Sequence, residues 1–214
     1  MRPVSVCIAL LAAIVIGGGP PQKPVEAKSG EAPVEVYADA DAYKVYAAAL
    51  AIDSWYWEGS NEILIVREIP PREWAPAGAE QILQGRTASV PEMEQILQSF
   101  REANKEPRLL NSEVDLHRAH RLVRSTDVEA ALAKGAEGKN SDSWQGFRAE
   151  FPNTAGYVRL SAVGFNATKT MALVYVEHHC GTGCGAANYY ILQKLGDVWV
   201  KYFPPNFENE KNKS

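Results

Sequence analysis

The sequence predicts an α+β protein in which an antiparallel C-terminal β-meander packs against several N-terminal helices. Helix-like segments dominate the N-terminal part of the chain, and strand-like runs separated by short turns fill the C-terminal part. Two cysteines, Cys180 and Cys184, flank one of those turns. Because short joints connect antiparallel neighbours, we expect the strands to form a meander and the helices to cover one face of the sheet.

The helices are predicted from apolar spacing and from residues that favour helix ends. A helix over residues 39–55 begins at Asp39 as its N-cap and contains an alanine-rich stretch. A second helix over residues 91–103 has Ser89 as its N-cap and Glu92 as the capping-box partner. The remaining predicted N-caps are Thr126, for a helix through Leu132, and Ser141 or Ser143, for a short helix that stops at Pro152.

The predicted strands are short, rich in β-branched residues and bounded by turn residues. An early run over residues 62–69 ends at Pro70, and a more ambiguous run covers residues 116–123. The four C-terminal runs are residues 157–163, 170–179, 187–194 and 198–202.

The composition excludes some classes of function. The chain has 214 residues, of which 46% are hydrophobic and 22% are charged, as is usual for a globular protein with one core. Its formal net charge is −4, whereas nucleic-acid binding needs a basic surface. We therefore expect no nucleic-acid partner. No glycine-rich phosphate loop or other cofactor motif occurs, so we expect no cofactor.

The N-terminus predicts export. Arg2 precedes an apolar run over residues 4–16, which has the length of a signal-peptide core and is too short to span a bilayer. Small residues around Ala27 offer a cleavage site. We expect a secreted or periplasmic protein with no stable membrane span after signal removal. The expected segments are a signal peptide (1–27), a disordered leader (28–38), a single α+β domain (39–206) and a flexible tail (207–214).

Two C-terminal motifs carry a resemblance. Residues 161–166 read SAVGFN, which fits an SxVGFN pattern, and residues 180–185 read CGTGCG, which fits CGxxCG. With these motifs the chain resembles a group of uncharacterised secreted bacterial proteins whose last strand carries a G-x-W motif. Here two residues separate Gly196 from Trp199, which departs from that spacing. The resemblance implies secretion and a bacterial source, but it implies no activity and no functional residue.

The segment His178-His179-Cys180-Gly181-Thr182-Gly183-Cys184 allows four interpretations. In the favoured one, the cysteines of an exported chain form a disulfide that closes a hairpin turn, and no metal binds. The thiolates and an imidazole could instead bind zinc, with a fourth ligand from His117 or His120. That site is disfavoured because successive strand residues point to opposite faces. The other two interpretations are thiol–disulfide exchange and acid–base chemistry by Glu177, His178 or His179.

Two further groups are candidate binding residues. His117 and His120 interleave with Arg118, Arg121 and Arg124, and this group forms either an anion site or a solvated basic edge; the basic edge is the favoured interpretation. Trp55 and Trp57 could stack on a sugar ring or fill a protein pocket if exposed, or they could cover the edge of the sheet.

These observations predict an exported, soluble, non-enzymatic binding or interaction module, with a protein or a carbohydrate as its ligand. The chain shows no convergent set of nucleophile, base and orienting residue. The competing hypothesis is a small hydrolase or metal-assisted enzyme that uses His178 and His179. A pocket that holds one of these histidines together with His117 or His120 would favour the enzyme. A purely structural role in the cell envelope is a third possibility.

Overall fold

The structure, a computed structural model, describes residues 34–52, 54–57, 59–60, 62–71, 90, 92–112, 116–136 and 142–203. The predicted signal peptide, residues 28–33 of the predicted leader and the predicted tail lie outside these residues. The prediction of a disordered leader is wrong for its last part, because residues 35–37 form a strand that pairs with residues 108–110. The described helices are α1 (Ala40–Ile52), α3 (Met93–Ala103), α4 (Ser125–Gly135) and α5 (Ser143–Glu150), with a 3₁₀ helix, η1 (Ser54–Trp57). The described strands are β1 (Glu35–Tyr37), β2 (Glu62–Val66), β3 (Glu68–Ile69), β4 (Arg108–Leu110), β5 (His120–Val123), β6 (Thr154–Leu160), β7 (Gly164–Phe165), β8 (Met171–Gly181), β9 (Cys184–Leu195) and β10 (Val198–Lys201).

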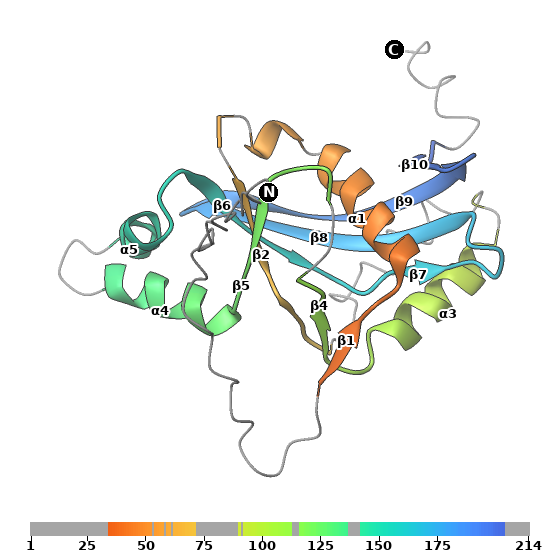
Figure 1. Cartoon of the computed structure of the whole chain (residues 1–214), viewed down its shortest axis with the longest axis horizontal. Coiled ribbons are helices and arrows are strands. Elements are labelled where there is room, and N and C mark those ends of the chain that lie inside the picture. The colour runs from red at the N-terminus through yellow and green to blue at the C-terminus, as the bar shows by residue number, and fades with distance from the viewer. Residues whose placement is uncertain are drawn as a thin grey trace, which may run out of the picture. The chain divides into compact units, whose positions relative to one another are not determined.

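The predicted C-terminal meander is confirmed. Strands β6, β8, β9 and β10 lie in this order in the large sheet, and each pairs antiparallel with the next. The fold is therefore α+β, with the meander packed against helices (Figure 1). The short joints predicted this arrangement because a turn of a few residues can only return the chain alongside the strand that precedes it.

The sheet also contains parallel pairs that the sequence did not predict. Strand β2 lies between β5 and β6 and pairs parallel with both. The predicted strand over residues 62–69 is in fact two strands, because the chain bends at Arg67. The second piece, β3, leaves the large sheet and joins β1 and β4 in a separate three-stranded sheet. A continuous apolar run does not reveal such a change of sheet.

Helices cover both faces of the large sheet, so the prediction of one covered face is wrong. Alternate side chains of β8 show the two sides: Val174 packs in the same cluster as α1, and Leu173 packs against α3. Figure 1 shows α1 and α3 on opposite sides of β8. On the α3 side, α4 and α5 pack over Leu64 and Tyr157. In β2 every position from the second residue to the last is buried, as expected for a strand covered on both faces.

The helix ends correct several of the predicted caps. Asp39 is confirmed, since its Oδ1 accepts hydrogen bonds from the backbone N–H groups of Asp41 and Ala42. Helix α1 ends at Ile52, and the predicted last turn is the 3₁₀ helix η1. The capping box at Glu92 is wrong. This residue precedes the first helical residue in a left-handed conformation, with φ of 56°, and its carboxylate accepts a hydrogen bond from Asn166. Ser89 lies outside the described residues.

Two other caps are also supplied by residues that were not predicted. Helix α4 begins at Ser125, and the carboxylate of Glu68 accepts the hydrogen bond from the Ser125 N–H at 2.8 Å, so Thr126 is not the N-cap. Helix α5 is capped by Asp142, whose Oδ1 accepts from the backbone N–H of Trp144. An acidic side chain suits either place because it lies at the positive end of the helix dipole.

The SAVGFN segment (residues 161–166) connects α1, α3 and the sheet through its backbone. The hydroxyl of Tyr46 on α1 donates to the carbonyl of Ser161 at 2.7 Å. Asn104, at the end of α3, donates to the carbonyl of Ala162 and accepts from its N–H. The side chain of Ser161 accepts from the N–H of Tyr175 in β8. This segment therefore positions both helices on the sheet.

The last residues of the SAVGFN segment have structural roles of the same kind. A Cβ at Gly164 would lie 2.5 Å from the backbone of Phe100, so only glycine lets α3 approach this closely. Asn166 closes the turn before β8, because its Oδ1 accepts from the N–H groups of Thr170 and Met171. The SAVGFN motif that carries the resemblance thus has a structural role.

No described helix is long and apolar enough to cross a membrane.

Candidate functional site

The candidate site is a pocket of about 790 Å³, which we call the α1 pocket. Three segments surround it: the outer side of α1 with η1, the loop that leads into β5, and the start of β10. Its lining residues are Lys44, Ala47, Ala48, Leu50, Ala51, Ser54, Ile63, Leu116, His117, Arg118, His120, Asp197, Val198 and Trp199. The apolar members of this set form most of the wall, and the charged members come from α1, the β5 loop and β10.

The first wall is a stripe of small residues on α1. Lys44, Ala47, Ala48 and Ala51 follow the spacing of one helix face and all line the pocket. The opposite face of α1 is buried against the sheet and carries larger side chains. Alanine side chains end at Cβ, so they leave an open volume above this face that larger residues would fill.

Three tyrosines hold α1 in place. The rings of Tyr37, Tyr43 and Tyr46 lie within 6.3 Å of one another. Tyr43 donates to the backbone carbonyl of Tyr37, and the Tyr37 hydroxyl accepts from the N–H of Val163 at 3.1 Å. Burial raises the pKa of Tyr37 to about 12, and it also raises the pKa of Tyr46 well above its ordinary value. These hydroxyls stay protonated near neutral pH, so the tyrosines fix α1 without adding charge.

The second wall is the loop from Leu116 to His120. His117 has a left-handed backbone with φ of 55°, which turns the chain just before β5. Arg118 then donates from Nη2 to the backbone carbonyl of Trp57 at 3.1 Å. The Nδ1 of His120 lies 2.9 Å from the carbonyl of Arg118. The turn brings His117 and His120 to the same pocket.

The third wall comes from β10 and the turn before it. Trp199 is 4% exposed, and its ring centroid lies 5.8 Å from that of Phe165. Its neighbour Val198 is 63% exposed, which is a large exposure for an apolar side chain. Asp197 is the acidic residue of the pocket lining. This wall therefore offers an apolar surface beside one carboxylate.

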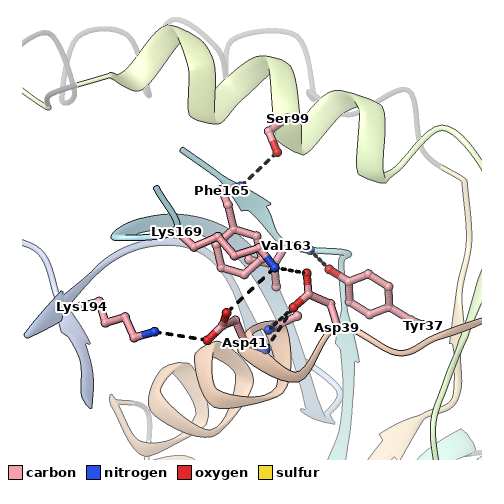
Figure 2. Close-up of polar contacts among 9 residues, drawn as sticks. Tyr37, Asp39, Asp41, Ser99, Val163, Phe165, Lys169 and Lys194 are labelled. Atoms are coloured by element: carbon pink, nitrogen blue, oxygen red, sulfur yellow. Dashed lines mark hydrogen bonds and ion pairs between the residues drawn. The ribbon is translucent and has the colours of Figure 1, made fainter. Parts of the chain in front are cut away.

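A second pocket of about 420 Å³ lies at the N-terminal end of α1, and its charged groups pair with one another. Figure 2 shows Lys169 beside Asp39, with an Nζ–Oδ2 distance of 3.0 Å, and Lys194 reaching Asp41 at 3.4 Å. Figure 2 also shows the Tyr37 hydroxyl at Val163 and the Ser99 hydroxyl at Phe165. These contacts fix the start of α1 and the SAVGFN segment, so we assign this second cluster a structural role.

His178 and His179 point to opposite faces of the sheet, as predicted from their adjacency. His178 is 3% exposed, and its ring centroid lies 4.4 Å from that of Trp57. Its pKa is lowered to about 4, mainly by burial and also by the nearby charge of His179, so its ring is neutral near pH 7. His179 stacks on Tyr157 at 4.7 Å on the other face. Neither histidine lines the α1 pocket.

Glu177 shares its face of the sheet with His179. The distance from Glu177 Oε2 to His179 Nε2 is 3.8 Å, and the Tyr175 hydroxyl lies 3.5 Å from Glu177 Oε1. This group belongs to the α5 side of the sheet, whereas the α1 pocket opens on the other side. The structure thus brings His117 and His120 together but separates them from Glu177, His178 and His179.

The remaining candidates are explained by structure. Cys180 and Cys184 form a disulfide across the end of the β8–β9 hairpin, with 5.2 Å between their Cα atoms. The residues between them are partly or fully exposed, so the hairpin ends at the surface. Trp57 is 1% exposed, and it is therefore not a binding aromatic on the surface. The side chain of Trp55 lies outside the described part.

Nothing among the described residues indicates a metal centre: no three His, Cys, Asp or Glu side chains gather closely enough to hold an ion. Comparison with protein-family models, with curated proteins and with solved structures finds no match to this chain.

Sequence reasoning missed most of the α1 pocket. It identified His117, Arg118 and His120 as one group, but it treated the alanines of α1 only as helix formers. The sequence did contain one indication of the pocket. The spacing of Lys44, Ala47, Ala48 and Ala51 places three small residues and a cation on one face of the predicted helix. The contributions of Asp197 and Trp199 could not be found in this way, because they depend on β10 lying beside α1.

Proposed function

We propose that this protein is an exported, non-enzymatic binding module and that the α1 pocket receives a small, largely apolar ligand. The observation that carries the proposal is the pocket itself. Its volume of about 790 Å³ falls within the range of small-molecule sites, roughly 300–1,000 Å³. Its wall is mainly apolar, with a few polar groups at the edge, which is the usual composition of such sites.

Three observations support export. The signal-like residues 1–27 lie outside the described part of the chain, so their support comes from the sequence alone. The disulfide between Cys180 and Cys184 suits an oxidising compartment such as the periplasm or the extracellular space. The resemblance to secreted bacterial proteins agrees with this location.

The hydrolase hypothesis is less well supported. It requires His178 or His179 in a pocket with a second polar side chain, and the α1 pocket contains neither. His178 lies beneath Trp57 and is neutral at physiological pH, so its ring cannot meet a substrate without movement of the 3₁₀ helix. His179 and Glu177 form an acid–base pair by distance, but they lie on the other face of the sheet.

The test uses the exported protein and the neutral fluorescent probe N-phenyl-1-naphthylamine. We expect saturable binding at one site. Ala51 is exposed and lines the pocket, so Ala51→Trp should fill the site and weaken binding by about tenfold, or ~1.4 kcal/mol. The matched control is Ala133→Trp on the exposed side of α4, which should bind the probe as the wild type does.

Melting temperatures of both variants are measured first, so that loss of folding is not mistaken for loss of binding. If neither this probe nor an anionic analogue of it binds, or if both tryptophan variants weaken the binding equally, the proposed binding function is wrong. Turnover of ester substrates that is lost in His179→Ala would favour the hydrolase instead.

A further inference from the structure

We infer that the ligand of the α1 pocket is an amphipathic organic anion, with an apolar body and one anionic group, that Arg118 binds the anionic group, and that Lys44 adds positive potential along the pocket. The inference rests on the proposed function, because it concerns the same pocket. It adds the chemical class of the ligand and assigns the two residues that select it.

The first argument is the pairing of charges. Half of the basic residues in the described part form ion pairs with described carboxylates. Such pairs include Arg108–Glu35, Arg121–Glu62, Lys134–Glu150, Arg148–Asp142, Lys169–Asp39 and Lys194–Asp41, with N···O distances from 2.7 to 3.4 Å. Lys44 and Arg118 line the pocket, and neither forms an ion pair with a carboxylate of the described residues. Arg67, Arg124, Arg159 and Lys201 also form no ion pair with a described carboxylate, so it is the position of Lys44 and Arg118 in the lining of a mainly apolar pocket that indicates a site for an anion.

The second argument is the way Arg118 is held. Its Nη2 donates to the carbonyl of Trp57 at 3.1 Å, which fixes the guanidinium at the edge of the pocket. A guanidinium has five N–H donors, so this bond leaves a pair of donors for a carboxylate, sulfonate or phosphate. An arginine already positioned by a backbone carbonyl loses little side-chain entropy when it binds such a group. The Trp57 side chain is buried, which holds the carbonyl that accepts this hydrogen bond in place.

The third argument is the shape of the apolar part. Lys44 and Ala51 are seven residues apart on one helix face, a rise of about 10 Å. Ala47 and Ala48 lie between them, and Ile63 and Trp199 also line the pocket. A medium-length alkyl chain or a two-ring system fits along this length. The guanidinium of Arg118 at one end of this length and the apolar wall beside it together match a molecule with one anionic end.

Asp197 is the acidic residue of the pocket lining, and it opposes the positive potential of Lys44 and Arg118. With two cations against one carboxylate, the charge of the lining favours an anion. Asp197 lies in the turn before β10 and forms no ion pair with Arg118, so the guanidinium keeps donors for a ligand.

The experiment compares two probes that share one ring skeleton and differ by a sulfonate. These are 8-anilinonaphthalene-1-sulfonate, an anion, and N-phenyl-1-naphthylamine, which is neutral. We expect the wild type to bind the anion about tenfold more tightly, and this preference to shrink as salt is added. The double variant Arg118→Gln with Lys44→Gln should bind both probes with equal affinity.

The control variant removes two cations elsewhere, Arg124→Gln with Lys105→Gln, and should keep the preference. Lys44→Gln alone is the safeguard if loss of Arg118 perturbs the fold, because Lys44 is exposed, and it should lose about half of the preference on a logarithmic scale. Equal affinities of the wild type for the two probes would overturn the inference and leave the proposed binding function intact. An anion preference that persists in the double variant would also overturn it. Binding of neither probe would refute the proposed function itself.

Discussion

Replacement of Asn104 by alanine tests whether the SAVGFN segment holds the fold together in the way described. Asn104 is fully buried at the end of α3. Its Oδ1 accepts from the N–H of Ala162 at 2.9 Å, and its Nδ2 donates to the carbonyl of Ala162 at 3.1 Å. Asn104→Ala removes both partners and leaves the two backbone groups of Ala162 buried without a hydrogen bond.

The expected cost follows from these two groups. An orphaned buried polar group costs about 1–3 kcal/mol, so the pair should lower the free energy of unfolding by about 3 kcal/mol. The substitution also removes a hydrogen bond from Asn104 Nδ2 to the carbonyl of Phe100. This loss adds little to the cost in stability, because the carbonyl keeps a hydrogen bond from the backbone N–H of residue 104. A change of this size is on the order of a hundredfold in the unfolding equilibrium constant.

The assay is urea unfolding followed by tryptophan fluorescence. The matched control is Asn188→Ala on β9, where the asparagine is half-buried, and its cost should stay below about 0.5 kcal/mol. A cost for Asn104→Ala below about 1 kcal/mol would refute the reasoning, since it would mean that water or a small shift satisfies Ala162. Preserved m-values would show that the variant unfolds to the same extent as the wild type.

Two other perturbations have definite expected outcomes. The pKa of His178 is lowered to about 4, so between pH 6.5 and 4 the unfolded chain binds a proton on this residue that the folded protein does not. The contribution of His178 to the free energy of unfolding is therefore fully present above pH 6.5. It is lost as the pH falls, by up to ~3 kcal/mol. Urea unfolding at pH 7, 5.5 and 4 should show the free energy of unfolding of the wild type falling more steeply than that of His178→Phe. If the two proteins lose stability in parallel, the lowered pKa of His178 is wrong. Cys180→Ser with Cys184→Ser should lower the free energy of unfolding by about 2 kcal/mol, the value expected for so short a loop. A reductant should produce the same loss in the wild type and none in the double variant, and equal responses of both proteins would count against the disulfide.

Local patterns in the sequence determined the C-terminal half of the fold. The alternation and short turns of residues 157–202 specify an antiparallel meander, because each strand meets its neighbour through a few intervening residues. A pair of cysteines beside one turn in a chain predicted to be exported favoured a disulfide over the alternatives, and the structure contains it. Asp39 as a helix cap is another local feature, since donor and acceptor lie within three residues.

Only the tertiary structure decided how distant segments pair, and this pairing builds the candidate site. Strand β2 pairs parallel with β5 and β6, so its partners lie far along the chain, and no turn signal marks a parallel pair. The α1 pocket likewise needs α1, the loop before β5 and β10 side by side. Residue types and their spacing report contacts within one helix, strand or turn. The free energy that brings separate segments together comes from non-directional burial of apolar surface, which leaves no local mark in the sequence.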